Sequence, residues 1–210
     1  MDPTALNRRK AILSRFSGDH KLAISLLKDK DPKVREAALS SLEKLGKLSE
    51  KTLSKSISDP SPGVRKRVVE LLAKRPDKIP FNVFNDEDPL VIETACWAAG
   101  EKENPTDKLI YKLCSIANGH TDQLCREAAV AALGATGSIL GLETILEALK
   151  DKPAIRRRAV IALAAFDDPK VEEALKKSLD DRDWQVRQIA EDLLDTNRVI
   201  SPVEIGPRPD

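Results

Sequence analysis

Few side chains in this sequence have the type and spacing that catalysis or metal binding requires. The two histidines, His20 and His120, stand 100 residues apart. No Cys-x-x-Cys or His-x-x-x-His metal motif and no glycine-rich phosphate loop occurs along the chain. The carboxylates that cluster in "EKENP" and "DDRD" are typical of solvated turns. We therefore predict a protein that is not an enzyme, with no catalytic residue, no metal site and no cofactor.

The three cysteines predict buried, reduced thiols. Cys96, Cys114 and Cys125 are odd in number and fall within apolar helical patterns. Cys125 precedes Arg126 near a predicted helix start, where a thiolate could be stabilised, but its apolar position favours an inert thiol. Because the sequence has no apolar run of membrane-spanning length and no N-terminus of the secretory type, we expect a cytoplasmic protein that makes no membrane contact.

One motif recurs along the chain. The string "DPKVREAALSSLEKLG", from Asp31 to Gly46, returns in five weaker copies, two of which open with a Ser-Pro or Asp-Pro helix start, at Ser61-Pro62 and Asp88-Pro89. Its first core position, which we call the Val column, recurs at spacings of 30, 27, 34, 30 and 31 residues and is occupied by Val34, Val64, Val91, Cys125, Ile155 and Val186. A period near 30 residues with helical content predicts an all-α solenoid of about six stacked antiparallel helix pairs.

The positions four and eight residues after the Val column are also small or apolar, so each copy predicts the second helix of a pair with one buried stripe. First helices are predicted over residues 21–28, 48–57, 79–84, 109–117, 139–149 and 169–179. Glu191, in a column that is otherwise apolar, predicts the polar outer face of a terminal repeat. We expect one repeat domain over residues 1–194, with a leading helix within residues 1–17 that places Arg8 in the arginine column, and a flexible tail over residues 195–210.

The motif "DPKVREAALSSLEKLG" and its copies resemble the HEAT repeat family, and within it the short repeats of the phycocyanobilin lyase type. The resemblance extends over residues 21–194 and implies an armadillo-like α-solenoid. HEAT-like proteins are mostly scaffolds and adaptors, a few are bilin lyases, and a related helical-repeat group acts as alkylpurine DNA glycosylases. The sequence specifies no pigment cavity, and Trp97 and Trp184 alone do not supply the groove aromatics expected of such a glycosylase.

An arginine follows the Val column in five repeats, and Ile92 replaces it in the third. An aspartate stands five residues before the Val column in four repeats, with His120 and Lys150 in that place elsewhere. Turn aspartates can cap helices and pair with arginines, so we interpret this set as a structural ladder that fixes the stacking of repeats. The alternative is that the arginines bind a ligand. The ladder residues are Arg35, Arg65, Arg126, Arg156 and Arg187 with Asp29, Asp59, Asp86 and Asp181.

A second column, six residues after the Val column, should lie on the exposed side of the second helices. Its ends are polar, but its middle is apolar, with Trp97, Ala131 and Ile161. In HEAT-like arrays the second helices usually line the concave side, so the resemblance places an apolar binding strip there. The alternative is that the twist of the stack turns Trp97 into a gap between repeats.

Basic triplets are predicted at the start of three second helices: Arg8-Arg9-Lys10, Arg65-Lys66-Arg67 and Arg156-Arg157-Arg158. Positive charge in a first turn opposes the helix dipole, so these side chains should either pair with carboxylates, which we favour, or bind an anionic partner. Residues 1–80 contain 19 Lys and Arg against 10 Asp and Glu, but the whole chain has a net charge of only +1. With aromatics at 3%, base stacking on nucleic acid has little support.

These patterns together predict a monomeric, non-enzymatic scaffold or adaptor that binds a protein partner on its concave face. Two alternatives stay open. One is an accessory or lyase-like subunit that acts on a cofactor-bearing protein, and the other, less favoured, is a helical-repeat protein that binds nucleic acid.

Overall fold

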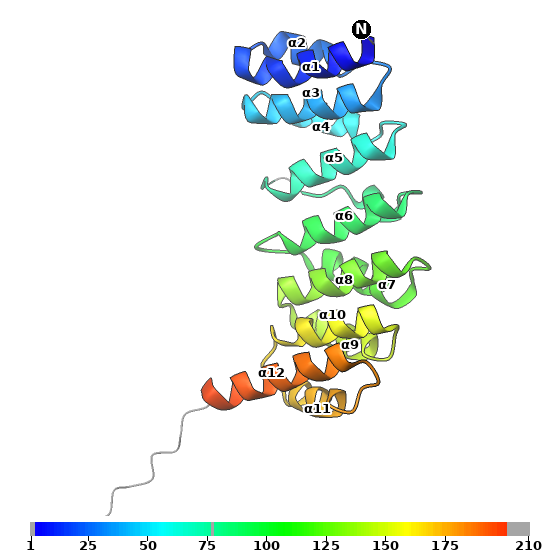
Figure 1. Ribbon diagram of the computed structural model, residues 1–210, viewed down its shortest axis with the longest axis vertical. Helices are drawn as coiled ribbons and strands as arrows, with labels where there is room; N and C mark the ends of the chain where they lie inside the picture. The colour runs from blue at the N-terminus through cyan, green and yellow to red at the C-terminus, as the bar shows by residue number, and fades with distance from the viewer. Residues whose placement is uncertain (1–2, 77, 201–210) are drawn as a thin grey trace, which may run out of the picture. The chain divides into compact units, whose positions relative to one another are not determined.

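The computed structural model describes residues 3–76 and 78–200, and these residues form twelve α-helices, two short 3-10 helices and no strand (Figure 1). The predicted all-α architecture of helical repeats is therefore confirmed. The chain divides into two compact units, residues 1–102 and residues 103–210. The single repeat domain expected over residues 1–194 stays a prediction.

The first unit stacks the leading helix and three second helices, each in contact with the next (Figure 1). Helix α2 packs on α1 and α3, and α4 packs on α5. The helices of this unit are α1 (Pro3–Ser17), α2 (His20–Leu26), α3 (Pro32–Lys44), α4 (Glu50–Ser56), α5 (Pro62–Ala73), η1 (Phe81–Asn85) and α6 (Pro89–Gly100), of which α1, α3, α5 and α6 form the stack.

The second unit repeats the arrangement with α8, α10 and α12 as its stacked second helices. Helix α7 packs on α8, α9 packs on both α8 and α10, and α11 packs on α12. The helices of this unit are α7 (Asp107–Gly119), α8 (Gln123–Thr136), η2 (Ile139–Gly141), α9 (Leu142–Ala148), α10 (Pro153–Leu163), α11 (Pro169–Ser178) and α12 (Trp184–Ile200).

Turn aspartates start several second helices, as the motif predicts. The side chains of Asp31, Asp88 and Asp122 accept hydrogen bonds from backbone N–H groups two residues later, at 2.6, 2.9 and 2.7 Å. Proline occupies the first turn of α3, α5, α6 and α10, where the helix has no use for its missing N–H group. Ser61, the N-cap residue of α5, makes no such side-chain bond, so proline alone marks that start.

Burial confirms the register of the repeat. Every residue of the Val column is at most 1% exposed, and the residues four positions later, from Ala38 to Ala190, are completely buried. The residues eight positions later are at most 9% exposed, the highest value belonging to Leu194 in α12. Glu191 is exposed, in agreement with a polar outer face on the last repeat. Stacking therefore supplies the core that no single helix pair could form.

The third repeat departs from the pattern because its first helix is the 3-10 helix η1. Two prolines, Pro76 and Pro80, precede this segment and disfavour a helix that starts earlier, since proline supplies no N–H group to a helix interior. A hollow of about 240 Å³ opens beside it, with Leu53, Ile57 and Leu72 among its lining residues. A helix of ordinary length would place more apolar side chains against this wall.

Three expectations about single residues need correction. Helix α1 begins at Pro3, so Arg8, Arg9 and Lys10 lie inside the helix and not at its start. Helix α12 continues to Ile200, past the point where we expected a tail, because the first proline after Leu194 is Pro202. Residues 201–210, where the rest of that tail would lie, fall outside the described residues. Cys96 and Cys125 are buried, whereas Cys114 is partly exposed.

Candidate functional site

Four arginines of the predicted ladder each donate two hydrogen bonds to an aspartate of the next repeat. Arg35 donates from Nε and Nη2 to the carboxylate of Asp59 at 2.8 and 2.6 Å. The other pairs have the same geometry, with distances between 2.7 and 3.0 Å, and are Arg65–Asp86, Arg126–Asp151 and Arg156–Asp181. Two pairs lie in each unit. Such two-pronged charge-assisted bonds fix direction as well as distance.

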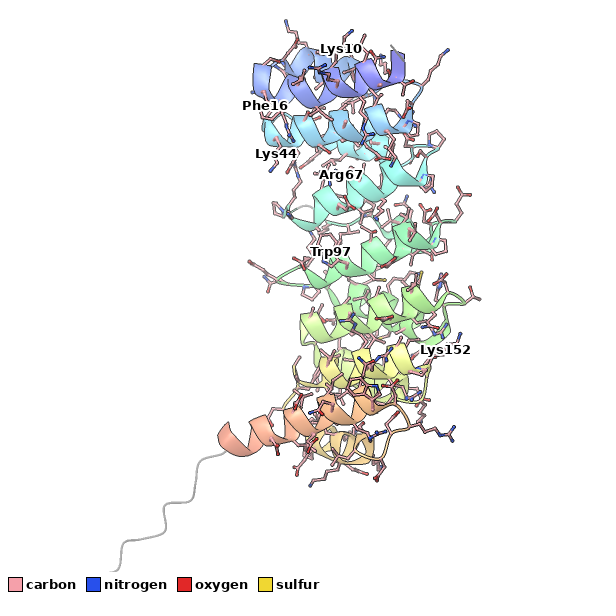
Figure 2. All side chains as sticks on the ribbon, viewed as in Figure 1. Lys10, Phe16, Lys44, Arg67, Trp97 and Lys152 are labelled. Atoms are coloured by element: carbon pink, nitrogen blue, oxygen red, sulfur yellow. The ribbon has the colours of Figure 1, made fainter. Side chains whose placement is uncertain are left out.

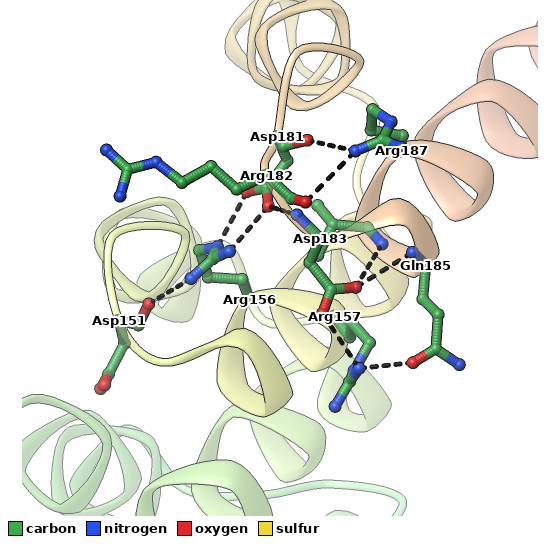
Figure 3. Close-up of polar contacts among 9 residues, drawn as sticks. Asp151, Arg156, Arg157, Asp181, Arg182, Asp183, Gln185 and Arg187 are labelled. Atoms are coloured by element: carbon green, nitrogen blue, oxygen red, sulfur yellow. Dashed lines mark hydrogen bonds and ion pairs between the residues drawn. The ribbon is translucent and has the colours of Figure 1, made fainter.

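The remaining guanidinium nitrogen connects each arginine to the turn before its own helix. Arg65 Nη1 donates to the carbonyl oxygens of Asp59 and Pro60 at 2.9 and 3.2 Å. Each aspartate in turn accepts a backbone N–H group of its own turn, as Asp181 does from Asp183 (Figure 3). One arginine thus joins two successive turns, and we interpret this ladder as a structural feature.

Charge pairing shifts the pKa values in the expected directions. Hydrogen bonds from Arg126 and Arg156 lower the pKa of Asp151 and Asp181, respectively. For Asp86, burial alone would raise the pKa, but the bonds from Arg65 and from the Asp88 backbone outweigh burial and lower it. The pKa of each paired arginine is raised, first by its bond to the aspartate.

The ladder also has positions that the sequence analysis assigned wrongly or missed. Asp151 pairs with Arg126, one residue after Lys150, which we had aligned with the aspartates. Asn7, and not Arg8, takes the leading position and donates to Asp29 at 2.8 Å. Shifting the alignment by one residue at each of these two places would have identified Asp151 and Asn7 as members of the ladder.

At the third position of the ladder, both the arginine and the aspartate that would pair with it are replaced. Ile92 stands in place of the arginine and is buried. His120 stands in place of the aspartate, and its Nδ1 accepts the backbone N–H of Asp122 at 3.0 Å. His120 therefore accepts the same kind of backbone hydrogen bond as the aspartates but does not supply their negative charge. In the last repeat Arg187 keeps its bonds to its own turn, at 2.7 Å to the carbonyl of Asp181 (Figure 3).

The basic triplets of α5 and α10 are largely engaged by carboxylates of their own unit. Arg67 donates to Glu70 at 2.8 Å and to the hydroxyl of Ser40 at 2.9 Å, and Lys66 lies 3.9 Å from Glu70. Arg157 pairs with Asp183 at 3.2 Å and also donates to Gln185 (Figure 3), while Arg158 pairs with Glu127 at 3.3 Å. By contrast, Arg8, Arg9 and Lys10 on α1 are all exposed.

The residues of the predicted apolar strip are exposed to different degrees. Trp97 is 42% exposed on α6, in the first unit, and Ile161 is 47% exposed on α10, in the second. Ala131 on α8, a direct neighbour of α10, is partly exposed. In the first unit, Lys44, Arg67 and Trp97 come from three successive helices of the stack, α3, α5 and α6 (Figure 2).

Two exposed leucines on the same helices were missed. Leu90 precedes Trp97 by seven residues and Leu124 precedes Ala131 by seven, so each shares a helix face with the later residue. Both leucines are 51% exposed. They stand at the residue before the Val column, where the other repeats have lysine, glycine, alanine or glutamine. This difference in residue type between repeats was the sequence signal that could have identified the two leucines.

A model of the HEAT repeat family, described as HEAT repeats, matches residues 20–81 and 110–195. The chain belongs to the HEAT repeat family. No curated protein matches it by sequence. The match omits residues 82–109, which contain most of η1 and all of α6.

Solved structures share the fold at low identity. YibA of Escherichia coli is 20% identical, with a TM-score of 0.63 over 94% of this chain and 76% of its own. A designed armadillo repeat protein in complex with the peptide (KR)4 is 16% identical, with a TM-score of 0.58 over 84% and 98% of the two chains. Another, YIII(Dq)4CqI, is 18% identical, with a TM-score of 0.55 over 82% and 97%. At these identities the likeness concerns the fold alone.

Other kinds of site find no support in the part of the chain that the structure describes. Over residues 3–76 and 78–200, no group of three or more histidine, cysteine, aspartate or glutamate side chains could hold a metal ion. Over the same ranges no helix is both long and apolar enough to cross a bilayer.

Proposed function

We propose that this HEAT repeat protein is a non-enzymatic scaffold that holds a protein partner on the exposed side of its second helices, which we expect to be the concave side. Trp97 carries the proposal. A tryptophan that leaves 42% of its surface in water on a helix whose neighbouring positions are buried is a typical interface anchor.

The surroundings of Trp97 suggest the kind of segment that it would hold. Leu90 extends the apolar surface by two turns of α6, so the partner should offer more than one apolar side chain. Lys44 is exposed on α3, in the same stack of helices. A carboxylate on the partner would complement this cation.

The second unit has its own candidate binding surface, which consists of smaller apolar side chains. Ala131 is followed four residues later on α8 by Ala135, and Ile161 is followed four residues later by Ala165 in the turn after α10; both of these alanines are exposed. Small aliphatic side chains allow close approach of a partner backbone but give little anchoring energy. We therefore expect Trp97 to dominate binding.

The fold comparisons support a binding role in general terms. One designed armadillo repeat protein of similar fold was solved with the peptide (KR)4, so a stack of this type can hold a peptide. The first unit of the present chain is net basic, because residues 1–102 contain 20 Lys and Arg against 15 Asp and Glu. We therefore expect its partner to be acidic or neutral near Trp97.

The nucleic-acid alternative is weakened by pairing. Arg65, Lys66 and Arg67 were the residues expected to contact phosphate, yet Arg65 is buried in its pair with Asp86 and the other two face Glu70. Binding to phosphate would have to displace these carboxylates.

The test is an affinity capture from a lysate of the source organism, with wild type and Trp97→Ala compared by mass spectrometry. Trp184→Ala is the matched control, since Trp184 is 65% exposed at the start of α12 in the second unit. We expect a protein that is retained by wild type and the control but lost from Trp97→Ala. With that partner purified, Trp97→Ala should weaken binding about tenfold or more, or at least about 1.4 kcal/mol.

Other results would contradict the proposal. Equal retention of the same partners by all three proteins would remove Trp97 from the binding surface. A coloured ligand that co-purifies would favour a lyase-like subunit. Nucleic acid that is released steeply by salt would favour the third alternative.

A further inference from the structure

Helix α1 has apolar side chains on two opposite sides. Its inner side packs on α3, where Ala11 and Ser14 are buried and the carbonyl of Ala11 accepts a hydrogen bond from Ser41 at 2.6 Å. On the outer side, Leu6, Leu13 and Phe16 are 39%, 47% and 72% exposed. With Arg9 they follow one another at spacings of three, four and three residues, which places all four on one stripe of the helix.

The apolar surface extends beyond this stripe. Ile12 borders it on α1 and is 38% exposed, and Ile24 on α2, which packs against α1, is 48% exposed. In a helical repeat, a surface of this kind is normally covered by the next helix pair, and terminal repeats carry polar residues there. The last repeat follows that rule, since Glu191 is exposed. The outer side of α1 does not follow it, because it exposes apolar side chains.

The charged residues of α1 indicate what kind of partner would cover this apolar surface. The described residues of α1 contain Arg8, Arg9, Lys10 and Arg15 and no carboxylate. Asp19, the next acidic residue along the chain, is already engaged as the N-cap of α2, where it accepts the Leu22 N–H at 2.9 Å. Phe16 lies at the end of the helix, with Lys10 near its middle (Figure 2), and the Arg15 guanidinium lies 4.6 Å from the Phe16 ring centroid.

We propose that the outer stripe of α1 (Leu6, Arg9, Leu13 and Phe16) docks an amphipathic helix of another protein that carries glutamate or aspartate beside its apolar residues. Leu6, Leu13 and Phe16 would pack between the ridges of that helix. Arg9, in the middle of the stripe, would be desolvated by the contact and needs a carboxylate opposite it. This surface is separate from the one around Trp97.

Two other occupants fit less well. A second copy docked through the same stripe would bring the cations of α1 against those of its mate with no carboxylate on either helix, which is repulsive. A lipid surface would attract the cations, but Arg9 lies among the apolar residues and not at their border, so insertion of the stripe would draw its charge toward the acyl chains.

The test uses a fluorescein-labelled model helix of about 18 residues, or roughly five turns, with leucine on one face and glutamate along both flanks. Fluorescence anisotropy should show saturable binding to the full chain. Replacing Leu13 and Phe16 together by serine should weaken binding about tenfold or more. Tyr111→Ser, a change at a side chain 59% exposed on α7 in the second unit, should leave it unchanged.

A charge exchange separates specific docking from general stickiness. Arg9→Glu should lose the glutamate peptide and gain the matched peptide in which lysine replaces glutamate, while wild type should prefer the glutamate peptide by about tenfold. Circular dichroism melting curves should agree among all variants, because the substituted side chains are exposed.

Four outcomes of the binding experiments would overturn the proposal. They are no binding of the glutamate peptide by wild type, equal binding of both peptides, binding that survives the serine changes, and stripe-dependent binding to phosphatidylserine vesicles in place of the peptide. A concentration-dependent dimer that Leu13→Ser abolishes would show instead that the stripe pairs with a second copy.

Discussion

At the scale of single residues, the arginine that follows the Val column is the most informative side chain of the repeat. Its guanidinium makes bonds in two directions, to an aspartate of the next repeat and to carbonyl groups of its own turn. A lysine has three donors on a single atom and could not copy this planar arrangement. The recurrence of arginine therefore reflects geometry as well as charge.

The Arg65–Asp86 pair is the best place to measure this contribution, because both side chains are about 10% exposed. Arg65→Met should lower the free energy of unfolding by about 2–4 kcal/mol, since Asp86 and two turn carbonyls lose their donor. Urea denaturation followed by circular dichroism measures the change.

Lys33→Ala is the control for that experiment. Lys33 is mostly exposed and pairs with Glu36 on its own helix at 3.0 Å, so its loss should change the free energy of unfolding by no more than about 0.5 kcal/mol. Similar effects for the two variants would mean that the ladder adds little to stability.

At the scale of elements, close approach of second helices depends on small residues. Gly134 on α8 faces Ala162 on α10, and a Cβ atom built on Gly134 would lie 2.6 Å from the Ala162 Cβ and 2.8 Å from its Cα. The contact includes backbone, which cannot turn aside as a long side chain can. This glycine sets how closely α8 and α10 pack.

Gly134→Ala should therefore destabilise the protein by about 1–3 kcal/mol, although alanine is the better helix former by about 1 kcal/mol. Gly119→Ala is the matched control, since Gly119 is also helical but has nothing within 4 Å of its added Cβ. Thermal melting should show a lower midpoint for the first variant and an equal or higher one for the second. The reverse order would place α8 and α10 further apart than described.

At the scale of the whole molecule, the chain consists of two compact units that differ in regularity. The second unit has an α-helix as the first helix of each repeat, whereas the first unit has η1 in the third repeat and the hollow beside Leu53, Ile57 and Leu72. Missing apolar contacts lower the stability of a repeat, and in repeat proteins local losses affect mainly the near neighbours.

We expect α5, in the first unit, to lose hydrogen-exchange protection at a lower urea concentration than α10, in the second. Pulsed exchange at a series of urea concentrations, read by mass spectrometry of peptides from each helix, measures this directly. A single common midpoint would show that the whole chain unfolds as one cooperative unit.

Most of the fold could be predicted from the sequence, because stacking imposes the same burial on the same positions of every repeat. The Val column and the columns four and eight residues later predicted three buried residues in each of the six second helices, from α3 to α12. The polar end at Glu191 followed from the same comparison. The family match over residues 20–81 and 110–195 agrees with that interpretation.

The candidate binding surfaces depended more on tertiary structure. Column arithmetic predicted that Trp97 and Ile161 face outward, but not the exposure of Leu90 and Leu124, which stand in a column that is polar or small elsewhere. The partner of Arg126 was misassigned to the Lys150 column, because turns between helices vary by one residue and carry no periodicity. The roles of all these residues in binding stay proposals.

The buried positions could be identified from periodic patterns alone, since these patterns record which side of a helix meets its neighbours. The folded arrangement was needed to identify which arginine meets which aspartate, how closely α8 approaches α10, and that the outer side of α1 exposes Leu13 and Phe16. The physical reason is that burial repeats with the helix, whereas pairing distances and uncovered surfaces depend on the turns and on what packs on each helix.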